Sequence, residues 1–147
     1  MPSIRTPSAL RVLVTSLLLL VPVAFAHVTK VVGDGAYTIV LGYLDSPLYA
    51  GQIEHVDISI TDAAGAPVEG LAESLRAEIV GPGGASVVVS VRAVRNSPGK
   101  YIANFIPTAV GNYDVRLSGF VGEHEFDELF AGVEMVHVDV MDGVFAG

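Results

Sequence analysis

The chain has 147 residues, about the size of one domain, and 51% of them are hydrophobic, which is ample for a core. Its formal charge of -8 at pH 7 argues against nucleic acid and anionic membranes as partners, because an acidic protein repels phosphate. The absence of cysteine from the sequence excludes disulfides, thiolate metal sites and lipid-modified cysteines.

The first 26 residues have the pattern of a secretory signal. Arg5 and Arg11 precede an apolar run from Val12 to Val23, and the small-x-small triplet Ala24-Phe25-Ala26 follows it. The apolar run is shorter than the roughly 20 residues of a membrane-spanning helix and contains a proline, so a cleaved signal is favoured over an anchor.

Cleavage after Ala26 divides the chain into a signal peptide (1–26) and a single domain (27–147), and it places the mature protein outside the cytoplasm, secreted or periplasmic. Two arginines and no acid leave with the signal, which takes the formal charge from -8 to -10. No second apolar run of spanning length follows in the sequence, so we expect no membrane span in the mature chain.

Short segments with alternating apolar and polar residues, separated by turn residues, follow one another along the rest of the chain. The segment 71–80 begins with the composition of a short helical turn and continues as a strand. The expected strands lie within residues 35–43, 53–61, 71–80, 86–94, 101–105, 113–117, 120–130 and 132–141. This pattern predicts an all-β, antiparallel, two-sheet immunoglobulin-like sandwich of about seven to nine strands, with a small closed barrel as the alternative.

The stretch 97–116 predicts two strands joined by a corner. Tyr101 and Phe105 share one face before the break at Pro107, and Tyr113 starts the next strand two residues after Gly111. A tyrosine in this position is typical of the tyrosine corner of immunoglobulin-like sandwiches, in which the phenol bonds back across the corner. We therefore expect a structural role for Tyr113.

Four stretches carry a resemblance to known domains: GAYTIVLGY, DSPLYAG, TDAAGAPVEGL and SPGKYIANFIPTAVGNYDVRLSGFVG. Over residues 35–122 the chain resembles small exported immunoglobulin-like domains of bacteria and archaea, of the YtkA-like type. More distantly it is similar to the copper-resistance periplasmic proteins of the CopC-like type. The first resemblance implies the fold, and the second implies copper(II) binding through an N-terminal histidine.

Signal cleavage would make His27 the N-terminal residue, whose amine and imidazole nitrogens suit copper(II). In the copper-resistance family, further ligands come from an Asp-x-His element, whereas this chain has the reverse order in His55-Val56-Asp57 and His137-Val138-Asp139. Residues two apart on a strand share a face, so each pair can present an imidazole and a carboxylate together. The candidate metal ligands are therefore His27, His55, Asp57, His137 and Asp139, with His124 as a further histidine.

Each candidate also has a structural interpretation. His27 can be an ordinary chain end, and both His-Val-Asp pairs fall where a strand exposes polar residues to solvent. The acids between Glu123 and Glu128 can bind calcium, but a charged edge strand that prevents aggregation explains them as well.

The sequence contains no Gly-x-Ser-x-Gly, no His-Glu-x-x-His and no phosphate-binding glycine loop, so we predict that the protein is not an enzyme. Two functions remain. The first is an exported binding or accessory domain whose partner is an envelope or extracellular protein. The second is a copper(II)-binding protein that uses the N-terminal histidine.

Overall fold

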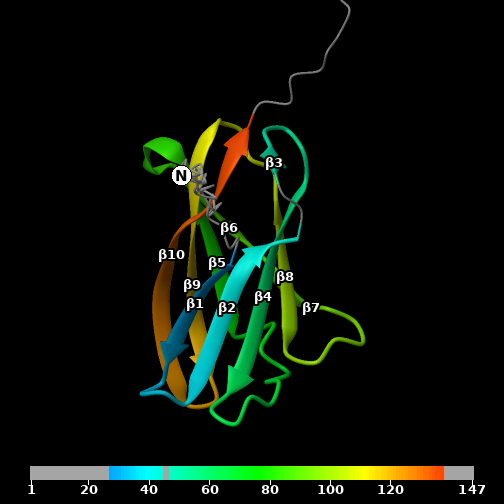
Figure 1. Ribbon diagram of the computed structural model, residues 1–147, viewed down its shortest axis with the longest axis vertical. Coiled ribbons are helices and arrows are strands. Elements are labelled where there is room, and N and C mark those ends of the chain that lie inside the picture. Colours follow the sequence, from blue (N-terminus) through cyan, green and yellow to red (C-terminus); the bar gives the residue numbers. More distant parts are fainter. Residues whose placement is uncertain (1–26, 45–46, 138–147) are drawn as a thin grey trace, which may run out of the picture.

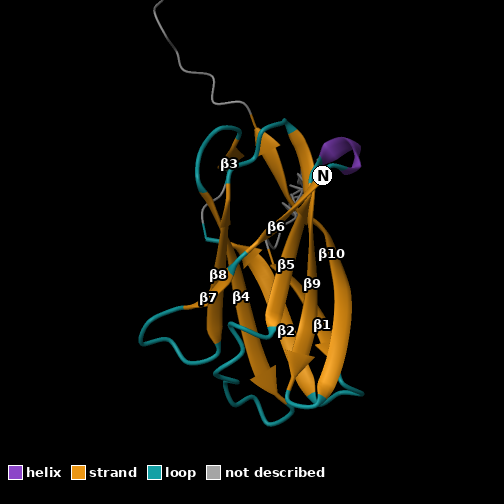
Figure 2. Ribbon diagram, turned by 180° about the vertical axis from the view of Figure 1, so that it is seen from behind, coloured by secondary structure: helices purple, strands orange, loops and turns teal. Residues whose placement is uncertain are grey.

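A computed structural model describes residues 27–44 and 47–137. In these ranges the chain forms two β-sheets packed face to face, and the strands run nearly along the long axis of the molecule (Figures 1 and 2). The predicted two-sheet immunoglobulin-like sandwich is thereby confirmed. No helix among the described residues is long and apolar enough to cross a membrane.

The first sheet has five strands, all antiparallel to their neighbours, in the order β1-β2-β4-β8-β7. In chain order these strands are β1 (His27–Val32), β2 (Tyr37–Tyr43), β4 (Glu54–Asp62), β7 (Val91–Ala93) and β8 (Lys100–Phe105).

The second sheet has the order β3-β10-β9-β5-β6. Its strands β10, β9, β5 and β6 are each antiparallel to their neighbours within that set. The two-residue strand β3 adds to the end of β10 in parallel. The strands are β3 (Leu48–Tyr49), β5 (Leu75–Val80), β6 (Ser86–Val89), β9 (Gly111–Val121) and β10 (His124–His137), and a 3-10 turn, η1 (Pro82–Gly84), joins β5 to β6.

The described residues contain ten strands, and several of them differ from the segments expected from the sequence. The strand β1 adds to the edge of β2, and the two-residue strand β3 lies in a segment that was not expected as a strand. Most of the two expected strands 120–130 and 132–141 forms the single strand β10. The run 86–94, expected as one strand, is divided at Ser90, where the chain passes from the second sheet (β6) to the first (β7). The short helical turn predicted before β5 is present, since the amide of Leu75 donates to the carbonyl of Leu71 at 3.0 Å.

The core lies between the sheets and is made by the alternate apolar residues of the strands. In β4, for example, Val56, Ile58 and Ile60 are fully buried, and the residues between them face outward. Full burial of one such side chain contributes about 1.5–3 kcal/mol, so this alternation fixes which face of each strand points inward. The largest fully buried side chains include Tyr101 and Phe130.

The two sheets are tied together along the edge that contains β1 and β10. The ammonium group of Lys30 in β1 bonds the carboxylate of Glu128 in β10 at 2.7 Å and lies 5.7 Å from the ring centre of Phe130. A lysine that reaches across an edge in this way discourages the pairing of a further strand there.

Candidate functional site

The strand β6 forms the outer edge of the second sheet through its hairpin with β5. Gly83 and Gly84 in the connecting turn have φ values of 84° and 85°, which favour glycine, and Pro82 starts the turn. The strand itself is the uncharged sequence Ser-Val-Val-Val, whose β-branched residues favour extended backbone. The turn and the strand composition together place an apolar edge at the side of the sandwich.

Alternate residues of β6 do not direct their backbone N–H and C=O groups toward β5. The amide of Gly81 donates to the carbonyl of Ala85 at 2.8 Å, and the register then pairs Ile79 with Val87. Because hydrogen-bonded pairs alternate along an antiparallel ladder, Val87 bonds toward β5, whereas the N–H and C=O groups of Ser86 and Val88 point away from the sheet. These groups can pair with a further strand.

A cavity of about 330 Å³ lies beside this edge, at the end of the sandwich where β8 ends and β9 begins. Its floor is formed by buried side chains of Ile79, Phe105 and Tyr113. Its rim includes the aliphatic side chains of Val87 and Ile106, each 53% exposed. The edge of β6 is thus next to an apolar hollow that can accept a side chain.

The tyrosine corner fixes the floor of this cavity. The hydroxyl group of Tyr113 donates to the carbonyl oxygen of Ala109 and accepts from the amide of the same residue, each at 3.1 Å, which confirms the predicted structural role. The ring of Tyr113 lies 5.7 Å from the ring of Phe105, which lies 6.1 Å from that of Tyr43. Such aromatic pairs stabilise a fixed arrangement, so the cavity is preformed.

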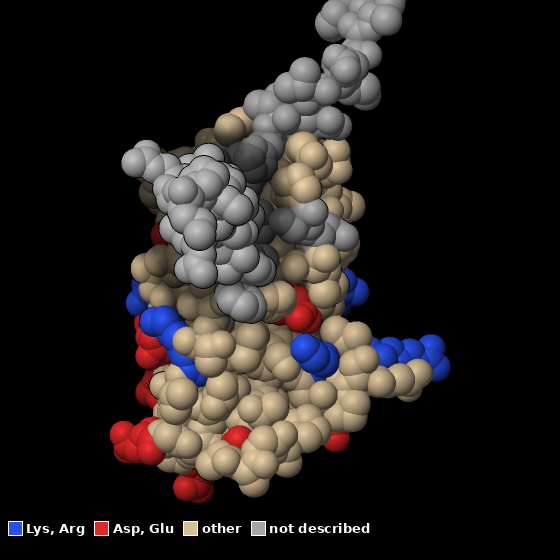
Figure 3. Space-filling view, in the orientation of Figure 1, with Lys and Arg blue, Asp and Glu red and all other residues tan. Residues whose placement is uncertain are grey.

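Charged residues cover the outer face of the second sheet next to β6. Arg116 and Asp127 form two hydrogen bonds, one of them 2.6 Å from the guanidinium Nε, and this contact raises the pKa of Arg116 and lowers the pKa of Asp127. Glu78 accepts a hydrogen bond of 2.6 Å from the hydroxyl of Ser86 and lies opposite Arg116 in the ladder. Elsewhere on the molecule, Figure 3 shows Lys, Arg, Asp and Glu on the middle and lower parts of the face that it draws.

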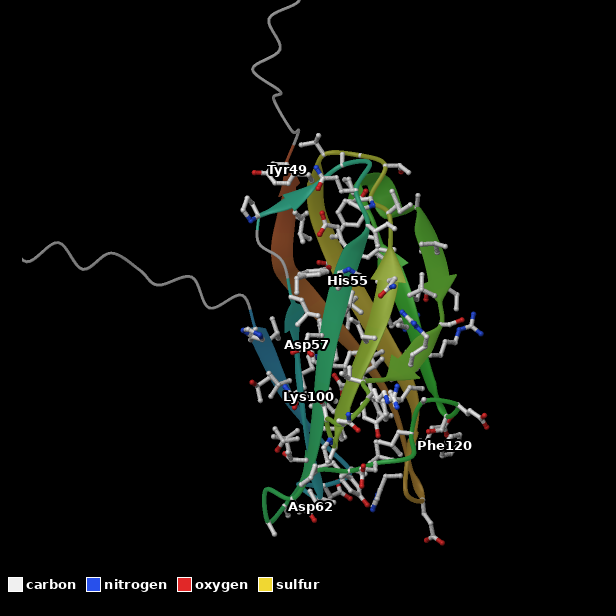
Figure 4. All side chains as sticks on the ribbon, turned by 90° about the vertical axis from the view of Figure 1, so that its right-hand side faces the viewer. Tyr49, His55, Asp57, Asp62, Lys100 and Phe120 are labelled. Atoms are coloured by element: carbon white, nitrogen blue, oxygen red, sulfur yellow. The ribbon has the colours of Figure 1, made fainter. Side chains whose placement is uncertain are left out.

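Three of the predicted metal ligands lie on the outer face of the first sheet. His27 in β1 pairs with Gly42 of β2, which pairs in turn with Asp57 of β4, so His27 and Asp57 belong to one row across the sheet. His55 lies two residues from Asp57 on the same face (Figure 4). A ring nitrogen of His55 is 3.0 Å from the side-chain oxygen of Asn104, and Asp57 is 3.7 Å from the Lys100 ammonium group.

The second His-Val-Asp pair is not brought to this face. His137 ends β10 in the other sheet, where its backbone pairs with Tyr49, and Asp139 lies outside the described residues. His124 packs its ring against Tyr37, with 5.6 Å between ring centres. Within residues 27–44 and 47–137, no group of three or more His, Asp and Glu side chains is close enough to hold one metal ion.

Two acids of the β9–β10 hairpin, Asp127 and Glu128, have structural partners in the described ranges. Glu128 binds Lys30, and Asp127 binds Arg116, so neither carboxylate is directed at a common point with its neighbours. This arrangement fits the charged-edge interpretation of the sequence better than the calcium interpretation.

Sequence reasoning missed the residues of the β6 edge and its cavity. The available signal was an uncharged β-branched run after the Gly81-Pro82-Gly83-Gly84 turn, since edge strands usually carry a charge or a proline. The cavity had no such signal, because its lining comes from segments up to 34 residues apart, from Ile79 to Tyr113, that only the folded topology brings together.

Comparison with known families gives one match: residues 23–123 match the family described as Filamin/ABP280 repeat. No sequence among the curated proteins matches the chain. The immunoglobulin-like class expected from the sequence agrees with this family, whereas the narrower resemblance to YtkA-like or CopC-like proteins stays a prediction. Since the match covers more than two thirds of its length, the chain belongs to the Filamin/ABP280 repeat family of immunoglobulin-like domains.

Proposed function

We propose that the protein is an exported, non-enzymatic binding domain that takes up an extended segment of a partner protein along the free edge of β6. The observation that carries this proposal is the outward-pointing backbone of Ser86 and Val88 beside the apolar cavity. Repeats of the filamin type are generally structural or interaction domains, which supports a binding role over a catalytic one.

Addition of a strand to a sheet edge combines two sources of affinity. Main-chain hydrogen bonds to Ser86 and Val88 contribute about 0.5–1.5 kcal/mol each, independent of the partner's sequence. An apolar side chain placed in the cavity against Phe105 and Tyr113 contributes roughly 25 cal/mol per Å² of apolar surface removed from water, and this part depends on the partner's sequence.

The proposal is tested with a variant that removes a hydrogen-bond donor from the free side of β6 and keeps the fold. The N–H of Val88 points away from β5, so Val88→Pro removes a donor from the free side and no bond of the hairpin. Val88→Thr keeps that donor and the β-branched shape, and it serves as the matched control. Circular dichroism and thermal unfolding of both variants verify that the fold is retained.

Wild type and the two variants are immobilised and exposed to an envelope extract, and the retained proteins are quantified by mass spectrometry. We expect a partner that wild type and Val88→Thr retain and that Val88→Pro loses. Equal retention of every protein by all three forms contradicts binding through β6.

We also propose copper(II) binding as a second function, supported by the row that joins His27, Gly42 and Asp57. The α-carbons of His27 and Asp57 are separated by two strand spacings, about 10 Å, and Gly42 between them has no side chain. An N-terminal amine and imidazole at His27 with a carboxylate from Asp57 is a donor set that suits copper(II). Asp57 would have to exchange its Lys100 contact for the ion.

The copper proposal requires a chain that begins at His27. Copper(II) is titrated into this chain, and the electron spin resonance of the bound ion is followed. One-to-one binding that is lost when an alanine precedes His27, and weakened in Asp57→Asn, supports the site. Binding that is unchanged by the added alanine contradicts it.

A further inference from the structure

We infer that the β6 edge binds a segment that is acidic toward its amino end and apolar toward its carboxyl end, and that residues 138–147 of a second copy of the chain are such a segment. This inference rests on the proposed strand addition at β6 and names its occupant. It follows from the different chemistry at the two ends of β6 and from the sequence of residues 138–147.

The two ends of β6 differ in charge. At its beginning, Ser86 and Val87 lie on the apolar cavity. Near its end is the exposed Arg76, on the outer face of β5 and one residue before Ala77, which pairs with Val89. Arg92, in the continuing strand β7, pairs with Ile102 and faces outward from the other sheet. An extended segment along β6 therefore meets apolar surface at one end and positive charge at the other.

Arg76 is available to a partner because its acidic neighbours are already engaged. Glu78, on the same face of β5, accepts the Ser86 hydroxyl and lies opposite Arg116. Within residues 27–44 and 47–137 the ion pairs use Lys30, Lys100 and Arg116 as cations, so that neither Arg76 nor Arg92 is paired there. A carboxylate placed just beyond the end of β6 on this face would lie near the positive charge of Arg76.

Residues 138–147 have the sequence Val-Asp-Val-Met-Asp-Gly-Val-Phe-Ala-Gly, in which both acids precede the pair Val144-Phe145. An antiparallel register that sets Phe145 opposite Val87 directs the aromatic ring toward the cavity. The same register sets Val144 opposite Val88 and Gly143 opposite Val89, where β6 ends, and it leaves Asp142 one residue beyond that end, on the side of the sheet that carries Arg76. Apolar and acidic residues thus meet their complements in a single alignment.

The direction of the segment indicates a second copy as its source. The strand β10 approaches its end at the pair Val136–Gly111, at the same end of the sandwich as the cavity. A continuation of the same chain would reach β6 at Ser86 and run parallel to it, which would put Asp139 and Asp142 at the apolar end. A segment from another copy can enter from the opposite end and run antiparallel.

The inference is tested by sedimentation equilibrium of the full chain over a range of concentrations, at low and at high salt. We expect concentration-dependent association that Phe145→Asp weakens at least tenfold, as loss of a central aromatic contact does. Arg76→Asp should weaken association about fivefold at low salt, and the double variant Arg76→Asp with Asp142→Lys should recover most of that loss. Arg95→Asp changes the same charge at an exposed position off this row and should leave association unchanged.

A monomer at all concentrations overturns the inference, as does association that Phe145→Asp leaves unchanged. The proposed strand addition at β6 can be tested independently of this occupant. If partner capture is lost in Val88→Pro but is the same in Phe145→Asp and wild type, and the chain is monomeric, then β6 binds another protein and residues 138–147 are not its occupant. If Val88→Pro retains both partner capture and self-association, the proposed strand addition and the proposed occupant are both wrong.

Discussion

The hydroxyl group of Tyr113 both donates to the carbonyl oxygen of Ala109 and accepts from its amide, with 3.1 Å between the atoms in each case. One phenol therefore satisfies two backbone groups of the corner that leads into β9. The ring below that hydroxyl is part of the cavity floor beside β6, so the residue that holds the corner also shapes the proposed binding surface.

Replacement of Tyr113 by phenylalanine tests the energetic role of the corner. The variant keeps the ring but leaves two backbone groups of Ala109 without this partner, so we expect a loss of about 1–3 kcal/mol in the free energy of unfolding. Urea denaturation measures the loss. Tyr49→Phe is the control, because the Tyr49 hydroxyl makes no hydrogen bond within the described residues; an equal loss in both variants contradicts the assignment.

Tyr101 ties the other end of the sandwich and gives a prediction about alkaline pH. Its hydroxyl donates to the carbonyl of Val68 at 2.6 Å and accepts from the amide of Leu71 at 3.2 Å. Burial raises the pKa of Tyr101, so the folded state favours the neutral phenol. The stability that the neutral phenol contributes is fully present below the usual tyrosine pKa of about 10. It is lost as the pH rises through the raised pKa of Tyr101 in the folded state.

We therefore expect the stability of wild type to fall more steeply above about pH 10 than that of Tyr101→Phe. Below that pH the variant should be less stable by about 1–3 kcal/mol, since Val68 and Leu71 lose a partner. Urea midpoints of both proteins between pH 8 and about 11 provide the comparison. Parallel pH profiles would show that the phenol does not titrate differently in the folded state.

The sandwich was predictable because most of its strands repeat apolar residues with a period of two. The buried set Val56, Ile58 and Ile60 alternates in the sequence just as it does in β4. The tyrosine corner was predictable as well, because Ala109 and Tyr113 are close in sequence and the contact is local. Local chemistry and short-period patterning thus specify most of the fold.

The candidate site was not predictable in the same way. The division of the run 86–94 at Ser90 depends on which sheet each half can pair with, and valines that favour strands occur on both sides of it. The Lys30–Glu128 contact, which closes the opposite edge, joins residues 98 apart. Without these long-range contacts the sequence could not indicate that β6, rather than β1, has the open edge.

Gly119 is the position in β9 where we expect a single methyl group to be least tolerated. Its φ of 141° is unusual for other residues, and a Cβ atom there would collide with the backbone carbonyl of Ser74. Gly119→Ala should therefore cost roughly 3 kcal/mol or more of unfolding free energy.

Gly132→Ala is the control for this prediction. Gly132 has a φ of 63°, and a Cβ atom there would have no atom within 4 Å, so only backbone strain of about 1–2 kcal/mol is expected. Urea denaturation of both variants separates the steric collision from the strain. Equal losses would mean that the backbone near Ser74 moves aside at little cost.

Glu54 holds the point at which the chain passes from one sheet to the other. It is only 3% exposed, and its Oε1 atom accepts a hydrogen bond of 2.9 Å from the amide of Tyr49 in β3. The strand β3 is only two residues long, so this bond adds to the burial of Leu48 in holding β3 against the end of β10.

Glu54→Leu removes the acceptor and should cost about 1–3 kcal/mol, whereas Glu54→Gln keeps an oxygen in place and should cost less. Amide hydrogen exchange locates the effect, because the loss of the acceptor should accelerate exchange at Tyr49 in Glu54→Leu and not in Glu54→Gln. Backbone amides of β4 should exchange at the same rate in both variants if the change stays local. Unchanged exchange at Tyr49 in Glu54→Leu would mean that pairing with β10 alone holds β3 in place.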